Sequence, residues 1–193
     1  MKKHFKNLRK AEELKEKEKY PEAIKTLENI LTENPKHIAA LEELANVFLL
    51  TDQDTKAKKV AAFLMELNHK NFTANHVLGF LELNNSNWHE AIEFLQKANE
   101  QDANNPEVLR CLGWGLFHKG DKTEGMAILE RALSLEPENP MALCDLGICL
   151  FQEQKIPEAK EHFKKAMEFE PENERIFELL DLVDRLEQAM GES

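Results

Sequence analysis

The chain has 193 residues, enough to bury a hydrophobic core, and its 42% apolar and 32% charged residues are ordinary for a soluble protein. Its formal net charge of −11 argues against nucleic acid as the main partner, because an acidic surface repels phosphate. No apolar run approaches the roughly 18 residues of a membrane-spanning helix, so we expect no membrane span.

The first twenty residues, MKKHFKNLRKAEELKEKEKY, are basic, whereas the rest of the chain is strongly acidic. This segment lacks the apolar core of a secretion signal, so we expect a cytoplasmic protein. Its positive charge indicates a solvated helix face or, alternatively, contact with an acidic partner. The three cysteines, Cys111, Cys144 and Cys149, match no CxxC or zinc spacing and are expected to be reduced structural thiols.

A period of 34 residues organises the chain. Residues 106–139 align with residues 140–173 without gaps: CLGWGLF lies over DLGICLF, and ILERALSLEPEN over HFKKAMEFEPEN. Residues 4–37, 38–71 and 72–105 fit the same frame. Each segment holds two apolar stretches with helical spacing, and one helix pair of this size cannot bury its apolar faces alone. The repeats therefore predict a stack of helix pairs.

This pattern resembles the tetratricopeptide repeat family. Position 8 of the repeat is small, position 7 is large and apolar in four of the five units, and position 20 is alanine, except for Gly125. These residues are Ala11, Ala45, Gly79, Gly113 and Gly147; Leu44, Leu78, Leu112 and Leu146; and Ala23, Ala57, Ala91 and Ala159. Position 32, usually proline, is proline in three units and His69 or Ala103 in the others. The resemblance implies a single-domain, all-α, right-handed α-solenoid of five helix-turn-helix units.

Residues 174–193 follow the last repeat and carry one apolar stripe, formed by Ile176, Phe177, Leu180, Val183 and Leu186. We expect a C-terminal capping helix that closes the last repeat's core. The alternative is a mobile segment that docks elsewhere, including in the protein's own groove. Within the fourth repeat, KGDK at residues 119–122 predicts a glycine-containing helix stop.

Catalytic patterns are absent from the sequence. It has no glycine-rich phosphate loop, nucleophile elbow or His–Glu metal helix, and its seven histidines share no spacing. We therefore expect no enzyme, no cofactor and no metal site.

In the family, the first helix of each unit lines a concave groove, chiefly through positions 2, 5, 9, 12 and 13. The resemblance places eleven candidate partner-binding residues there: Asn46, Leu49, His76, Phe80, Leu83, Arg110, Trp114, Phe117, Cys144, Ile148 and Phe151. Position 9, often polar in the family, is bulky and apolar in three successive units. Such an apolar column predicts a protein or peptide partner with an apolar or amphipathic segment, either helical or extended.

Alternatives remain for several candidates. Leu83, Phe117 and Phe151 also fit core packing between units. Arg110 could orient an acidic group of the partner, or pair with Glu107 one turn earlier. The terminal helix or a second copy of the protein could cover the apolar column.

One function of the family is disfavoured. Its members that hold the C-terminal carboxylate of heat-shock chaperones use a lysine at position 5 with an asparagine at position 9, and Asn46 is instead accompanied by Glu42. Three functions remain: an adaptor or scaffold; a client-shielding chaperone, similar in size and charge to the translocator chaperones of type III secretion; and a self-associating structural protein, such as a homodimer.

Overall fold

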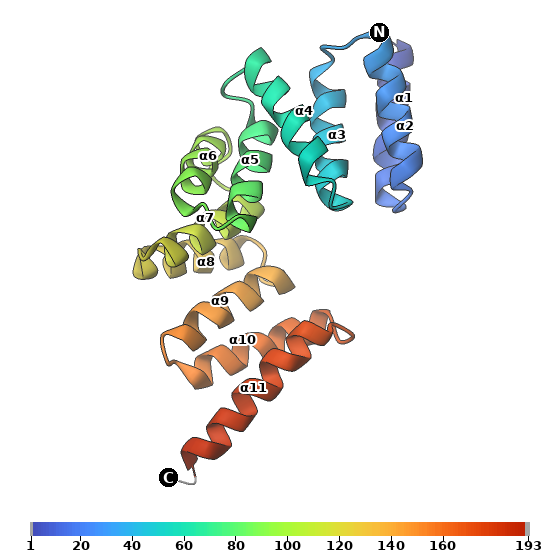
Figure 1. Cartoon of the computed structure of the whole chain (residues 1–193). Coiled ribbons are helices and arrows are strands. Elements are labelled where there is room, and N and C mark those ends of the chain that lie inside the picture. The colour runs from blue at the N-terminus through green and yellow to red at the C-terminus, as the bar shows by residue number, and fades with distance from the viewer. Residues whose placement is uncertain (1, 192–193) are drawn as a thin grey trace. The chain divides into compact units, whose positions relative to one another are not determined.

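The computed structural model describes residues 2–191, and within that range the chain forms eleven helices joined by short turns, without a strand (Figure 1). In chain order they are α1 (Lys2–Glu16), α2 (Tyr20–Glu33), α3 (Ile38–Leu50), α4 (Asp54–Leu67), α5 (Phe72–Asn84), α6 (Trp88–Gln101), α7 (Pro106–Lys119), α8 (Lys122–Leu135), α9 (Pro140–Gln152), α10 (Ile156–Phe169) and α11 (Glu174–Gly191). The predicted all-α fold of helix pairs with a terminal helix is confirmed. Among these helices, none combines the length and apolarity needed to cross a bilayer.

The helices repeat with the period of the sequence. The second helices of the pairs, α2, α4, α6, α8 and α10, each begin 34 residues after the one before. The first helices α3, α5, α7 and α9 follow the same spacing, and so does α11. The chain divides into two compact units, which we call unit 1 (residues 1–102) and unit 2 (residues 103–193).

Asparagine side chains cap most of the first helices. The Oδ1 atoms of Asn71, Asn105 and Asn139 accept hydrogen bonds of 2.8, 3.1 and 3.0 Å from the backbone N–H groups three residues later. His37 caps α3 in the same way through Nδ1, at 3.3 Å from the Ala40 nitrogen. Each cap satisfies an N–H group that has no partner inside the helix.

The turn inside each pair ends the first helix with one left-handed residue. The five residues lie 34 positions apart: Glu18 (φ 56°), Asp52 (53°), Ser86 (59°), Gly120 (116°) and Gln154 (62°). The N–H of the following residue donates to a carbonyl five positions back, as from Asp121 to Leu116 at 2.9 Å. This is the Schellman motif. Gly120 supplies the glycine predicted in KGDK, whereas the other four turns adopt the same conformation with a side chain.

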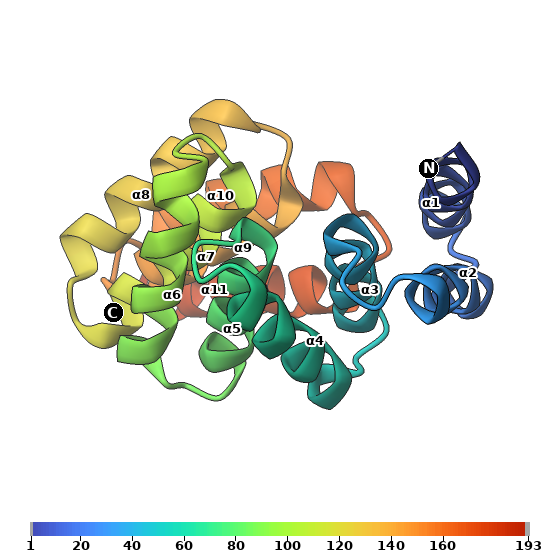
Figure 2. The same cartoon turned by 90° about the horizontal axis from the view of Figure 1, so that it is seen from above.

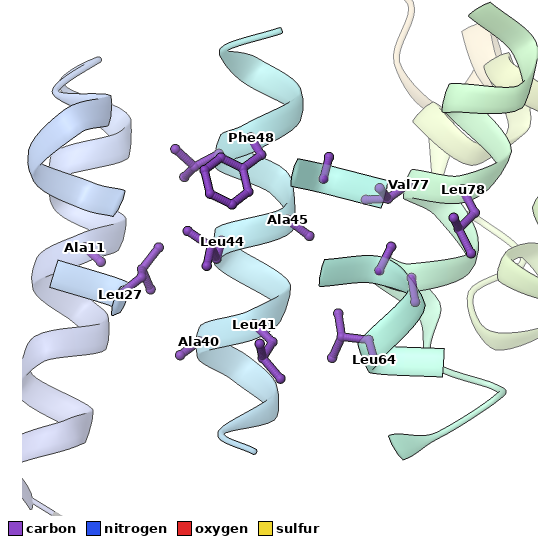
Figure 3. Packing of buried hydrophobic residues seen from close by; sticks show 14 of the residues in the cluster. Ala11, Leu27, Ala40, Leu41, Leu44, Ala45, Phe48, Leu64, Val77 and Leu78 are labelled. Carbon is purple, nitrogen blue, oxygen red and sulfur yellow. The ribbon is translucent and has the colours of Figure 1, made fainter. Parts of the chain in front are cut away.

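Unit 1 packs α1 to α6 around a buried apolar core. Ala11 of α1 and Leu27 of α2 face Leu44 and Phe48 of α3, and Leu64 of α4 belongs to the same cluster (Figure 3). All five side chains are at most 5% exposed. Helices of one pair lie side by side, as α1 and α2 do in both views (Figure 1, Figure 2).

In unit 2, α7 and α8 approach closely at two glycines. A Cβ atom on Gly113 would lie 2.7 Å from the Gly125 carbonyl oxygen, and one on Gly125 would lie 2.6 Å from the Gly113 oxygen. In the next pair, a Cβ on Gly147 would lie 2.5 Å from the Phe163 ring. The small residues predicted at positions 8 and 20 therefore let α7 and α8 approach closely, and the small residue at position 8 does so for α9 and α10.

Helix α11 packs against α10 (Figure 1, Figure 2). Ile176 and Val183 are buried in the core of unit 2. Lys160 of α10 ties the helix down further, with its Nζ 2.5 Å from Asp184 Oδ1 and 2.6 Å from Glu187 Oε2. The helix thus covers the end of the last pair, as expected of a cap. Glu192 and Ser193, which were included in the predicted segment, lie outside the described residues.

Candidate functional site

The candidate residues of unit 1 lie on α3 and α5. Asn46, Leu49, His76 and Phe80 are half-buried, so each keeps part of its side chain accessible. The His76 ring stacks on Phe72, with 6.2 Å between ring centroids. Leu83 is 7% exposed, so core packing, the alternative reading of the sequence, describes this side chain. We call Asn46, Leu49, His76 and Phe80 the α3–α5 surface.

The candidate residues of unit 2 lie on α7 and α9. Trp114, Ile148 and Phe151 are half-buried and rest on one buried cluster, which includes Leu146 and Cys149. Phe117 belongs to the interior of that cluster and is 2% exposed, so its side chain is not available to a partner. The cluster gives the three accessible side chains a close-packed base.

His118 supports the Trp114 ring from the next turn of α7. The two ring centroids are 4.1 Å apart, with an angle of 59° between the planes. The His118 and Phe117 rings lie edge-to-face, with 5.5 Å between their centroids. Burial lowers the pKa of His118, because desolvation disfavours the charged imidazolium. A neutral imidazole therefore packs beside Trp114 near neutral pH.

Arg110 is engaged within unit 2 and is not open to an acidic group of a partner. Its Nε and Nη2 atoms donate to the two carboxylate oxygens of Glu107 at 2.9 and 2.6 Å. Its Nη1 donates to Asp145 Oδ2 of α9 at 2.6 Å. The side chain is 10% exposed. The pairing with Glu107 that the sequence offered as an alternative is therefore present, and Asp145 extends it into a tie between α7 and α9.

Burial keeps the cysteines of unit 2 unreactive. It raises the pKa of the half-buried Cys144 to about 11 and that of Cys149 to about 12. It also raises the pKa of Cys111, which is fully buried. Thiolates are the nucleophilic form, so these thiols are weak nucleophiles near pH 7. Cys144 therefore offers the surface a small apolar contact rather than a reactive group.

Exposed apolar residues of the first helices that the sequence reading missed include one on α9 and one on α3. Met141, at position 2 of α9, is 52% exposed, and Leu50, at position 13 of α3, is 56% exposed. Both positions belong to the groove positions of the family, so the repeat register alone could have found them. Met141, Cys144, Ile148 and Phe151 are spaced to share one face of α9. Together with Trp114 they form what we call the α7–α9 surface.

Two family models of the tetratricopeptide repeat match the sequence, over residues 8–67 and 116–182. The chain belongs to the tetratricopeptide repeat family. Membership favours an interaction module over an enzyme and supports a role in protein–protein interaction. A comparison with curated protein sequences finds no match.

Solved structures share the fold at low identity. TTC0263, a thermophilic protein of this family from Thermus thermophilus, is 20% identical with a TM-score of 0.75, covering 93% of this chain and 98% of its own. PilF of Pseudomonas aeruginosa is 17% identical with a TM-score of 0.75, covering 96% and 84%. YrrB, described as a tetratricopeptide repeat protein with an unusual peptide-binding site, is 18% identical with a TM-score of 0.62, covering 89% of each chain.

Proposed function

We propose that the chain is a non-enzymatic adaptor or scaffold that binds an apolar or amphipathic protein segment on the α7–α9 surface. The observation that carries the proposal is the accessibility of Trp114, Met141, Ile148 and Phe151 on two adjacent first helices of one unit. Position 9 is often polar in this family, so a tryptophan and an isoleucine at this position make the surface unusually apolar. The peptide-binding site named for YrrB is a precedent within the fold.

The energetics fit a peptide partner. Full burial of one large apolar side chain is worth about 1.5–3 kcal/mol, and aromatic rings contribute most at interfaces. Association costs on the order of 4–15 kcal/mol in lost freedom, so several such side chains must be covered together. The α7–α9 surface offers several such side chains, and the buried cluster beneath them already holds them in place. Little ordering is needed on the protein's side, which favours affinity.

A partner helix that presents apolar residues at i, i+3 or i+4, and i+7 fits the stripe on α9, and an extended segment is the other solution. The α3–α5 surface offers a second apolar contact, with Phe80 as its aromatic residue. We place the protein in the cytoplasm, in keeping with its three unpaired cysteine thiols.

The test is affinity capture from the native cell, followed by mass spectrometry and by binding measurements with the captured segment. We expect Met141→Asp to weaken binding at least tenfold while the melting curve stays the same, because Met141 is half exposed. Phe169→Asp is a matched control, since Phe169 is 43% exposed but lies on the second helix α10. It should bind as the wild type does.

Trp114→Asp is a second variant with a larger expected loss of binding, and its melting must be measured because the ring also packs on the cluster. Wild-type binding by Met141→Asp would refute the proposed surface. A client-shielding chaperone would differ in one further measurement: it would keep an aggregating client in solution at stoichiometric amounts, whereas an adaptor would only bind it.

A further inference from the structure

Helix α11 occupies the place of a first helix in a sixth repeat. It begins at Glu174, 34 residues after the start of α9, and Asn173 caps it as Asn139 caps α9. A first helix normally receives a second helix on one side, as α9 receives α10. In the described chain, no helix follows α11 to cover the corresponding side.

In α9, the residues facing α10 are Leu143, Leu146, Gly147 and Leu150, and all four are buried. The residues 34 positions later in α11 are Phe177, Leu180, Asp181 and Asp184. Of these, Phe177 is 65% exposed and Asp181 is exposed. Leu180 and Asp184 are half-buried, and Asp184 pairs with Lys160 of α10. The uncovered part of this face therefore lies around Phe177 and Asp181, and it carries an acidic group where α9 has a glycine.

An open hollow lies beside Phe177. It has a volume of about 440 Å³ and is lined by Phe177 together with Pro171, Glu172, Asn173, Glu174 and Glu178. The helix as a whole carries five Asp and Glu residues against two Arg residues. A partner for this face must therefore offer an apolar side chain flanked by positive charges.

The chain itself contains such a helix. In α1, Phe5 is 71% exposed, the largest exposed fraction among the large apolar side chains of the described residues. Exposed Lys6, Arg9 and Lys10 lie beside it, and the first turn holds no acidic residue. Residues at i and i+4 share a helix face, so Phe5, Arg9 and the two lysines form one basic and apolar patch.

We propose that the uncovered face of α11 binds α1 of a second copy of this chain. Phe5 of the second copy enters the hollow beside Phe177, and Lys6 and Lys10 face Glu174 and Glu178. The contact joins two different surfaces, so it is a head-to-tail association that leaves an α1 and an α11 available for further copies. Opposite charge and one aromatic anchor on each side determine the partner, and the association should weaken with salt.

The test is sedimentation velocity of the intact chain over a roughly hundredfold concentration range. We expect the mass to rise with concentration at about 0.05 M salt and to fall back toward the monomer at about 0.5 M. The double variants Lys6→Glu with Lys10→Glu, and Glu174→Lys with Glu178→Lys, should each stay monomeric. Their mixture should associate, because the first keeps an acidic α11 and the second keeps a basic α1.

Lys25→Glu with Lys36→Glu is the matched control, since both lysines are exposed in unit 1 and the charge change is the same. It should associate as the wild type does. A wild type that stays monomeric at every concentration, or a mixture that fails to associate, would overturn the proposal. Binding of a partner at the α7–α9 surface uses other residues, so Met141→Asp should associate normally and the two proposals fail independently.

Discussion

Gly125→Ala is expected to destabilise the chain, although alanine is both the better helix former and the usual residue at this repeat position. Helix propensity alone favours alanine by about 1 kcal/mol. The added Cβ, however, would lie 2.6 Å from the Gly113 carbonyl oxygen and 2.6 Å from the Phe117 nitrogen. Both are backbone atoms, so the clash can be relieved only if α7 and α8 move apart, and not by the rotation of a side chain.

Overpacking of a buried contact costs about 1–3 kcal/mol, and a clash with backbone belongs at the upper end. After subtraction of the propensity gain, we expect a net loss of about 2 kcal/mol in the free energy of unfolding. For a chain of this size that lowers Tm by about 4–8 °C. Thermal and urea unfolding followed by circular dichroism would measure it.

The control is Ala127→Gly, because Ala127 is exposed and lies in the same helix. That change lowers the helix propensity without altering the contact with α7, and it should lower the free energy of unfolding by about 1 kcal/mol. If Gly125→Ala instead raises the free energy of unfolding by the amount that Ala127→Gly lowers it, propensity governs the site. The close approach of α7 and α8 would then not be a constraint.

Two further predictions concern the turns and pH. Gly120→Ala should lower the free energy of unfolding by about 1 kcal/mol, and Gln154→Gly should raise it by up to about 1 kcal/mol, because both residues adopt the left-handed backbone conformation. If urea unfolding shows the free energy changing in the same direction and by the same amount for both variants, the prediction is wrong. Burial lowers the pKa of His118, so its unfolded form takes up a proton first as the pH falls from 7 to 5, and stability is lost there. His118→Gln should lose less stability over that interval in unfolding titrations, and an unchanged slope would refute the assignment.

The fold could be predicted from the sequence because the same residue pattern recurs in each repeat. A 34-residue period with small residues at two fixed positions places ten helices in pairs, and all of them except α1, which begins at Lys2, begin within the predicted units. The glycine in KGDK also marked the turn at Gly120. What the sequence did not show is that Glu18, Asp52, Ser86 and Gln154 adopt the same left-handed conformation, since the motif's hydrogen bonds outweigh the backbone preference of those residues.

The candidate surface could be predicted only in part from the sequence. Position 12 holds Phe117 and Phe151 in successive repeats, yet one is buried and the other half-buried, because burial depends on neighbours and not on position alone. The pairing of Arg110 with Glu107 follows from helical spacing, whereas its bond to Asp145 joins residues 35 positions apart. Such a bond requires knowing how one repeat rests on the next.

The asparagine caps have a consequence for dissecting the array. Each cap is the last residue of one 34-residue segment, yet it closes the first helix of the following segment. A fragment cut at Pro106 or Pro140 would therefore begin with frayed N–H groups, whereas one cut a residue earlier, at Asn105 or Asn139, would keep them satisfied. For truncation and for recombination of repeats, the modular boundary thus precedes the capping asparagine, and each module carries its own cap at its first residue.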